Sequence, residues 1–384
     1  MKRELIATAA FGLEAVVRRE VEALGYKVLR TEDGKVTYEA DERGIVRSNL
    51  WLRSADRVLV KIAEFQAPTF EDLFQQTMGC PWEEWIPVDG RFVVTCTTVK
   101  SQLHNEPACQ RTVKKAIVNR LQDFYVTDTL PESGADHTVK LTLLKDRATL
   151  TIDSTGMGLH KRGYRVADVT APIKETMAAA LVQLSFWKPG RILVDPCCGS
   201  GTIPIEAALI GMNIAPGLNR SFDAEQWDQV PASLWKEERK KAFQEIRTDT
   251  QLQIYGYDID PAAAAAAEEN AAEAGVDDQI IFRRADVNRL KEQTNPIWEP
   301  WRSEEGVVLL TNLPYAIRIG TQPELKKIYR SLRETLEEEP TWNLFAITAD
   351  KELEKELGRK ADRRRKLYNG SIETTYYQYH SLRR

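Results

Sequence analysis

The sequence predicts an α/β fold, with a doubly wound and mostly parallel sheet in the second part of the chain and an α+β module before it. From Pro172 onward, short apolar runs alternate with helical patterns, as in a parallel sheet with helices on both faces. A glycine-rich turn directly follows the first of these apolar runs, which is typical of doubly wound sheets. Up to residue 155, strand-like runs and helical patterns are both present.

The first 155 residues contain both strand-like and helical patterns. In order, we expect a strand at 5–8, a helix at 12–24, strands at 27–30 and 35–39, mixed periodicity at 49–65, a strand at 91–98, a helix at 107–121, and a strand pair at 139–144 and 148–153. Residues 156–163 contain three glycines and are the predicted linker. We therefore expect a first segment at 1–43 and a second at 44–155.

Residues 164–384 are the predicted doubly wound domain. Its expected strands are 191–195, 252–258, 279–283, 306–311 and 343–349, and its expected helices are 172–186, 202–210, 261–274 and 323–338. Residues 212–250 interrupt this alternation, so we interpret them as an insertion.

The composition is that of an ordinary globular protein, with 42% hydrophobic and 29% charged residues in a chain of 384. No apolar run approaches the roughly 18 residues of a membrane span, and we find no signal peptide, so we expect a cytoplasmic protein. The five cysteines form no CxxC pair, which favours a reducing compartment and argues against a zinc site. We expect no bound metal. The net charge of −4 does not by itself indicate a nucleic-acid binder.

The glycine-rich turn is Asp195-Pro196-Cys197-Cys198-Gly199-Ser200-Gly201, between an expected strand and an expected helix. Glycines let the backbone approach a ligand, and the N-terminus of the following helix faces that ligand. A Walker loop would need Gly-Lys-Ser/Thr, and the turn contains no lysine. A dinucleotide fingerprint would need a third glycine where Pro204 stands. The turn therefore favours a nucleotide-like cofactor of another class.

Acidic residues follow the next two expected strands. Asp258 stands where an acid can accept both hydroxyls of a ribose. Asp260 precedes Pro261 and an alanine-rich helix, so we predict that it caps that helix. Asp286 follows the third strand and could accept the amino group of adenine, with an ordinary turn residue as the alternative.

The fourth expected strand runs into Asn312-Leu313-Pro314-Tyr315, the predicted catalytic loop. The amino nitrogen of a base is a poor nucleophile because its lone pair is delocalised into the ring. The Asn312 side-chain oxygen and the Leu313 carbonyl can each accept one amino proton, and Pro314 rigidifies the loop. Tyr315 can stack on a base that has left its duplex. Together with the glycine-rich turn, this loop predicts methyl transfer from S-adenosyl-L-methionine to an amino nitrogen.

With these motifs, the chain resembles the THUMP-domain RNA guanine-N2 methyltransferases, and within them the 23S rRNA enzymes of the RlmL/YpsC type. The resemblance extends over nearly the whole chain. Residues 195–201 match the family's DPxCGSG motif, 257–261 its GxDxDP pattern, 159–165 its LHxRGYR hinge, and 366–370 with 376–379 its C-terminal signature. The resemblance implies a Rossmann-like class I methyltransferase domain with a seven-stranded sheet.

The resemblance also implies an RNA-binding module, with a ferredoxin-like segment at 1–43 followed by a THUMP domain at 44–155. It places Phe222 and Trp227 in an insertion near the substrate side. The residues expected to contact RNA lie in the THUMP-like region and in two basic clusters, for which a solvated face is the alternative. They are Lys100, Arg111, Lys114, Lys115, Lys161, Arg162, Arg165, Arg363, Arg364 and Lys366.

The cofactor residues come from the two acidic turns, the glycine-rich turn and the family segment that precedes it. They are Pro172, Glu175, Thr176, Asp195, Pro196, Cys198, Gly199, Ser200, Gly201, Asp258, Ile259 and Asp286.

The catalytic loop departs from the family, which usually has NPPYGERLG where residues 312–320 read NLPYAIRIG. NLPY also occurs in rRNA adenine-N6 dimethylases, but those enzymes lack a THUMP-like half and have a different glycine motif. We therefore expect methylation of guanine N2 in 23S rRNA. The alternatives are a tRNA guanine-N2 enzyme, amino methylation of adenine, DNA or a protein glutamine, and an RNA-binding protein without activity, against which the intact motifs argue.

Overall fold

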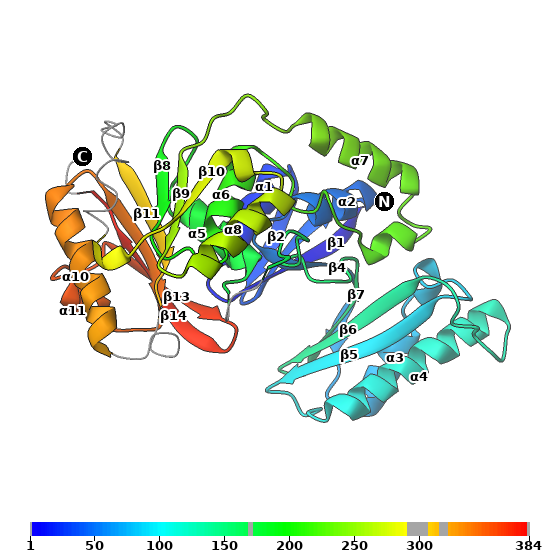
Figure 1. Cartoon of the computed structure of the whole chain (residues 1–384). Coiled ribbons are helices and arrows are strands. Elements are labelled where there is room, and N and C mark those ends of the chain that lie inside the picture. The colour runs from blue at the N-terminus through cyan, green and yellow to red at the C-terminus, as the bar shows by residue number, and fades with distance from the viewer. Residues whose placement is uncertain (1, 168–171, 290–305, 315–321, 382–384) are drawn as a thin grey trace. The chain divides into compact units, whose positions relative to one another are not determined.

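The computed structural model describes residues 2–167, 172–289, 306–314 and 322–381. They divide into two compact units, each with a seven-stranded sheet (Figure 1). The first unit comprises Met1–Ala9, Val17–Leu159 and Arg220–Lys241, and the second comprises Ala10–Val16, His160–Asn219 and Ala242–Arg384. In the part of the chain that the structure describes, no helix is long and apolar enough to cross a membrane.

The sheet of the first unit has the strand order β2-β3-β1-β4-β7-β6-β5. Its strands are β1 (Arg3–Ala9), β2 (Lys27–Glu32), β3 (Lys35–Ala40), β4 (Ala55–Gln66), β5 (Arg91–Val99), β6 (Asp136–Leu144) and β7 (Arg147–Asp153). Its helices are α1 (Glu14–Ala23), α2 (Glu42–Trp51), α3 (Phe70–Met78) and α4 (Glu106–Tyr125). The order β1-α1-β2-β3-α2-β4 is that of a ferredoxin-like module, and β5, β6 and β7 extend its sheet.

The observed elements do not fit the expected boundary between the first segment, 1–43, and the second, 44–155. A division between residues 43 and 44 falls inside α2, because the ferredoxin-like module continues to the end of β4. The mixed periodicity at 49–65 has a simple cause, since that window covers the end of α2 and most of β4. Along β5 and β6, buried and more exposed residues alternate, so one face of this sheet packs on helices and the other is accessible.

The sheet of the second unit has the strand order β10-β9-β8-β11-β12-β14-β13. Its strands are β8 (Ile192–Asp195), β9 (Ile254–Asp258), β10 (Ile280–Arg284), β11 (Val307–Asn312), β12 (Asn343–Thr348), β13 (Arg363–Asn369) and β14 (Ile372–Tyr379). Its helices are α5 (Glu175–Leu184), α6 (Thr202–Gly211), α8 (Pro261–Glu273), α10 (Gln322–Glu338) and α11 (Leu353–Glu356). The first five strands are parallel, and β14 runs antiparallel to both of its neighbours.

Helices cover both faces of this sheet, as the alternation of strands and helices predicts. Apolar side chains of α5, α6 and α8 pack on one face, and those of α10 pack on the other (Figure 1). The central strands β8 and β11 carry nearly continuous apolar runs because both of their faces are buried. The fold is therefore the doubly wound one, with an antiparallel β13–β14 hairpin at its edge.

Each unit contains a segment whose neighbours in the sequence belong to the other unit. Residues 10–16 join the second unit, where Arg365 donates a hydrogen bond to the carbonyl oxygen of Gly12 at 2.7 Å. A Cβ atom at Gly12 would lie 2.7 Å from the carbonyl oxygen of Lys366, so this crossing needs a glycine. Residues 220–241, which include most of α7 (Ala232–Gln244), join the first unit.

Residues 220–241 contain two aromatic residues that we expected near the substrate. Phe222 and Trp227 are buried in the core of the first unit. Trp227 stacks on His137 with 5.2 Å between ring centroids, and its indole N–H donates to the Asp136 carbonyl oxygen at 3.1 Å. Phe222 stacks on Trp235 in the same way, at 5.3 Å. Their aromatic surface therefore serves packing.

Candidate active site

The glycine-rich turn joins β8 to α6 and takes a conformation that requires its glycines. Gly199 and Gly201 have φ angles of 54° and 80°, in the left-handed region. A Cβ atom on Gly201 would lie 2.9 Å from the Cβ of Ala267 and 2.9 Å from the Phe282 ring. The backbone of this cofactor loop (residues 195–201) is thus pressed against α8 and β10. No side chain caps the N-terminus of α6, so its first N–H groups are available to a ligand.

The side chain of Asp195 stabilises the turn that follows it in the cofactor loop. Its side chain is buried, and one carboxylate oxygen accepts a hydrogen bond from the N–H of Cys197 at 3.1 Å. Burial raises the pKa of Asp195 to about 7, and the neighbouring carboxylate of Asp258 acts in the same direction. This carboxyl group therefore holds the turn as an internal acceptor.

Asp258, at the end of β9, is joined to the cofactor loop. One carboxylate oxygen accepts from the N–H of Gly199 at 2.9 Å, and the other accepts from the N–H of Asp260 at 3.0 Å. Beside it, the predicted cofactor residue Ile259 is 58% exposed. Asp260 caps α8 by accepting from the N–H of Ala262 at 2.9 Å, which confirms the predicted cap.

Asp286 follows β10 and is partly buried. One of its carboxylate oxygens accepts from the N–H of Asn288 at 2.9 Å, which is the geometry of an ordinary turn residue. A carboxylate has acceptor sites beyond this one, so the contact does not remove Asp286 from the predicted adenine site.

Asn312 ends β11 at the carboxyl edge of the sheet, next to the cofactor loop. Its register partner is Ile347 of β12, and the N–H of Leu313 donates to the Ile347 carbonyl oxygen at 3.0 Å. The side-chain oxygen of Asn312 is buried, yet it accepts no hydrogen bond from any described residue. A buried acceptor without a partner is costly, so this atom is poised for a donor from a ligand. Pro314 is partly buried, and Tyr315 lies outside the described residues.

One cavity brings the two motifs together. It is lined by Pro172, Ile173, Asp195, Cys197, Cys198, Gly199, Ser200, Thr202, Ile203 and Asn312. Sequence reasoning missed four of these residues, Ile173, Cys197, Thr202 and Ile203. The first three are adjacent to a predicted residue, and Ile203 follows Thr202 in the first turn of α6. Among the predicted cofactor residues, Glu175 and Thr176 are buried at the start of α5 and are not among the residues that line this cavity.

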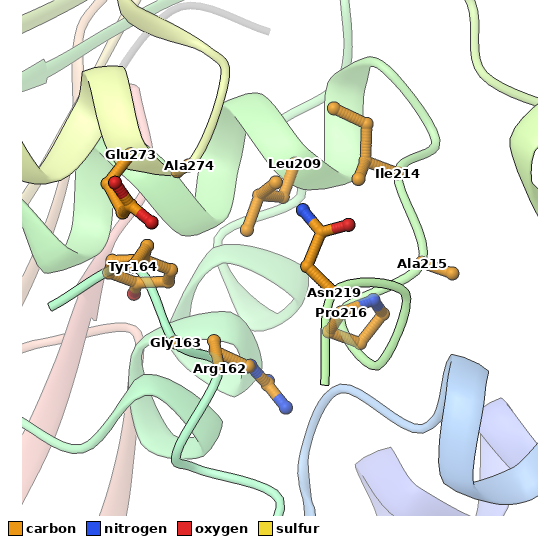
Figure 2. Close-up of a pocket in the computed structure, with 10 residues that line it drawn as sticks. All are labelled: Arg162, Gly163, Tyr164, Leu209, Ile214, Ala215, Pro216, Asn219, Glu273 and Ala274. Carbon is orange, nitrogen blue, oxygen red and sulfur yellow. The ribbon is translucent and has the colours of Figure 1, made fainter. Parts of the chain in front are cut away.

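A larger cavity of about 120 Å³ lies elsewhere and is not this site (Figure 2). It is lined by Leu209 near the end of α6 and by Glu273 at the end of α8, together with Tyr164 and Asn219. Both helices run antiparallel to the strands, so their ends lie at the amino edge of the sheet, opposite Asn312. Ligands of open α/β sheets bind at the carboxyl edge, where the two motifs meet.

The residues predicted to bind RNA fall into two groups. Lys100, Arg111, Lys115, Lys161, Arg363, Arg364 and Lys366 are exposed, and Lys114 is partly exposed. Arg162 is only 5% exposed and forms an ion pair of 3.3 Å with the buried Glu206, so it lacks the exposure that a phosphate contact needs. Arg165 is also largely buried, in an ion pair of 3.0 Å with Glu175. The sequence His160–Arg165 identifies these side chains as cations, but it does not indicate that the fold buries two of them.

Two of the exposed cations in the second unit are paired. Arg364 lies 3.2 Å from Glu354, and Lys366 lies 2.6 Å from Glu373. On α4, in contrast, Arg111 and Lys115 are four residues apart and so share one exposed helix face. In the described ranges, no group of three or more His, Cys, Asp or Glu side chains could hold a metal ion.

The chain matches known families over most of its length. Residues 162–378 match the RMKL-like methyltransferase domain, residues 4–59 the RlmL ferredoxin-like domain, and residues 67–153 the THUMP domain. The ferredoxin-like match ends within β4, in agreement with the observed sheet.

Similar proteins have been described in bacteria. The chain is 47% identical over 382 residues to the "Putative RNA methyltransferase YpsC" of Bacillus subtilis, covering 99% of this chain and 96% of that protein. It is 35% identical to "Ribosomal RNA large subunit methyltransferase K/L" of Syntrophotalea carbinolica, covering 96% of this chain but only 52% of that protein. The chain therefore spans about half the length of this second relative.

A solved structure extends the likeness to the cofactor. "SMU.472, a putative methyltransferase complexed with SAH" is 41% identical, with a TM-score of 0.91 over 100% of this chain and 99% of that one. SAH is the demethylated product of S-adenosylmethionine. The glycine turn, the acid at the end of β9 and the uncapped N-terminus of α6 fit that cofactor. The chain belongs to the RMKL-like methyltransferase family, with a THUMP domain and S-adenosyl-L-methionine as its cofactor.

Proposed function

We propose that this protein methylates the exocyclic N2 amine of a guanosine in 23S rRNA. The observation that carries the proposal is at Asn312, whose side-chain oxygen is a buried acceptor without a described partner. This residue lines the same cavity as Gly199 and Ser200. An amino group placed there would satisfy this oxygen and lie beside the cofactor loop.

The residues of the chain promote the reaction by orienting the amino group of the base. S-adenosylmethionine supplies an electrophilic methyl group when it is bound. Asn312 accepts one proton of the amino group, and the Leu313 carbonyl accepts the other, so the nitrogen lone pair turns away from the ring and toward the cofactor loop. No strong base is needed, because the nitrogen becomes acidic only after methylation. Tyr315, which lies outside the described residues, keeps its proposed role of stacking on the flipped base.

RNA is the proposed substrate because of the THUMP domain and the two relatives named for RNA methylation. Exposed cations suit phosphate binding, and Arg111 and Lys115 present two of them on one face of α4. The preference for guanine N2 and for 23S rRNA comes from the family resemblance. The Leu313 variation in the catalytic loop supports adenine as the second candidate base, and tRNA is the second candidate substrate.

Nucleoside analysis of rRNA and tRNA tests the proposal. We expect a strain without this protein to lack one N2-methylguanosine in 23S rRNA, and re-expression of the wild type to restore it. Re-expression of an Asn312→Ala variant shows whether the modification needs the catalytic residue or only the presence of the protein. We expect that this variant does not restore N2-methylguanosine. Loss of a modified guanosine from tRNA, or of a methylated adenosine, would replace the proposed substrate by the corresponding alternative.

A further inference from the structure

A single buried asparagine connects the cofactor loop with a segment that follows the return of the chain to the second unit at His160. This lead-in segment consists of residues 162–167. Asn270 lies in the last part of α8 and is 1% exposed. Its side-chain oxygen accepts from the N–H groups of Val166 at 2.9 Å and Ala167 at 3.0 Å. Its side-chain nitrogen donates to the carbonyl oxygens of Ala167 at 3.0 Å and Ser200 at 3.1 Å.

These four hydrogen bonds use the full capacity of the amide, since asparagine has two donor hydrogens and two acceptor lone pairs. A buried polar group that is completely satisfied fixes the geometry of its partners, whereas an incompletely satisfied one is destabilising. Asparagine is a poor helix former, and its neighbours in α8 are mainly alanine and glutamate. Its place in this helix is therefore explained by what the side chain binds.

The contact with Ser200 reaches the cofactor loop at its centre. Ser200 lies between Gly199 and Gly201, the two glycines with left-handed φ angles, and it lines the cavity that also contains Asn312. One turn before Asn270, the Cβ of Ala267 lies where any side chain on Gly201 would have to stand. The same face of α8 therefore contacts the loop at two successive positions.

Arg165 forms a second connection between the lead-in segment and the walls of the cavity. Its guanidinium donates to the Ile173 carbonyl oxygen at 3.0 Å and to the Thr202 hydroxyl at 3.1 Å. Ile173 and Thr202 both line the cavity, and the ion pair with Glu175 holds the guanidinium in place. The lead-in segment is thus bonded to three elements around the cavity: the segment before α5, the cofactor loop through Asn270, and the first turn of α6.

We propose that Asn270 is a positioning residue that holds the cofactor loop in its binding conformation and makes cofactor affinity depend on the order of the lead-in segment. The dependence is reciprocal, because two events linked through one structural element must affect each other equally. Cofactor binding therefore orders residues Val166 and Ala167, although neither lines the described cavity.

Hydrogen exchange on the full-length wild-type protein tests the reciprocal effect. Adding SAH should slow exchange of the Val166 and Ala167 amides, which donate to Asn270, by several-fold. Amides in the first unit that also donate to a side chain, such as that of Val58, which donates to the Thr155 hydroxyl, serve as the control and should not change. Unchanged exchange at Val166 and Ala167 under saturating SAH would overturn the proposal.

Two substitutions separate positioning from general stability. Asn270→Ala removes all four bonds and should weaken SAH binding about tenfold in calorimetry. Asn270→Asp keeps acceptors for Val166 and Ala167 but places a carboxylate against the Ser200 carbonyl, so it too should bind SAH weakly while retaining more protection of the two amides. Wild-type SAH affinity in the folded Asp variant would show that the Ser200 contact does not position the loop.

Asn49 provides a matched control for lost stability. It is also a fully buried asparagine, and it donates to Ile45 and Ser154 and accepts from Thr155, all within the first unit. Asn49→Ala should lower the melting temperature to a similar degree and leave SAH affinity within twofold of wild type. An equal loss of SAH affinity in both alanine variants would assign the effect of Asn270 to stability alone.

Discussion

The N–H of Gly199 donates a 2.9 Å hydrogen bond to the carboxylate of Asp258, so the cofactor loop and the end of β9 hold each other in place. The residue proposed to bind the ribose therefore also supports the loop. We predict that Asp258→Ala weakens SAH binding at least tenfold, and that Asp258→Asn weakens it less because an amide oxygen can still accept from Gly199. Calorimetry measures both. Asp260→Ala, which removes only the cap of α8, is the control, and equal weakening in this variant would argue against a ribose contact by Asp258.

The catalytic proposal makes its sharpest prediction at Asn312. Asn312→Ala should keep the fold, SAH affinity and RNA affinity, yet lower the rate of methyl transfer roughly 10²–10³-fold, the usual effect of removing one positioned electrostatic group. Asn312→Asp should retain more activity than alanine because a carboxylate still accepts protons. Single-turnover assays with the RNA identified by nucleoside analysis measure the rate. A wild-type rate for Asn312→Ala would mean that another group accepts the amino proton.

The raised pKa of Asp195 predicts a pH dependence of stability. The pKa is about 7 in the folded protein against a usual value of 3.8, so between these values the folded state binds more protons than the unfolded state. This carboxyl group therefore makes folding less favourable as pH rises from about 4 to 7. Asp195→Asn keeps an acceptor for the Cys197 N–H but does not titrate. In urea unfolding, the free energy of unfolding of the wild type minus that of this variant should fall over that pH range and level off above it. If the two free energies change with pH in parallel, the raised pKa of Asp195 is contradicted.

RNA binding should depend on the cations of α4. Lys115→Glu and Arg111→Glu should each weaken RNA binding, and the salt dependence of the affinity should become shallower by about 0.7 per lost single-strand phosphate contact. Filter binding over a series of salt concentrations gives both quantities. Lys188→Glu makes the same change of charge at an exposed position before β8, at the amino edge of the second sheet, and should have little effect. If all three variants weaken binding equally, net charge rather than the α4 face is responsible.

The sequence predicted the second unit closely because its strands are buried on both faces and end in chemically distinctive residues. β8, β9 and β11 deliver Asp195, Asp258 and Asn312 to one edge, and each was identified from its motif. The strand β13 was not expected, because it begins with three arginines and a lysine. On an edge strand these side chains can reach solvent, so the apolar alternation that marks a strand is lost.

The contacts that sequence reasoning missed are those between distant segments. Phe222 and Trp227 pack into a core formed by residues far earlier in the chain, and no local pattern specifies that partner. The burial of Arg162 depends on Glu206 of α6 in the same way. Asn270 did leave a signal, since an asparagine interrupts an alanine-rich helix, but its partners in the lead-in segment and the cofactor loop are visible only in the fold.

The exchange of segments between the two units has a consequence for synthesis on the ribosome. Domains are usually completed in the order in which they emerge. Here the core of the first unit lacks Phe222, Trp227 and Trp235 until residues 220–241 have been made, well after the second unit has begun. Residues 10–16 must wait still longer, because Gly12 meets Arg365 and Lys366 near the end of the chain. The first unit therefore cannot be completed before residue 241 is made, and the second cannot be completed before the end of the chain. A product released early at residue 200 would expose an incomplete aromatic core.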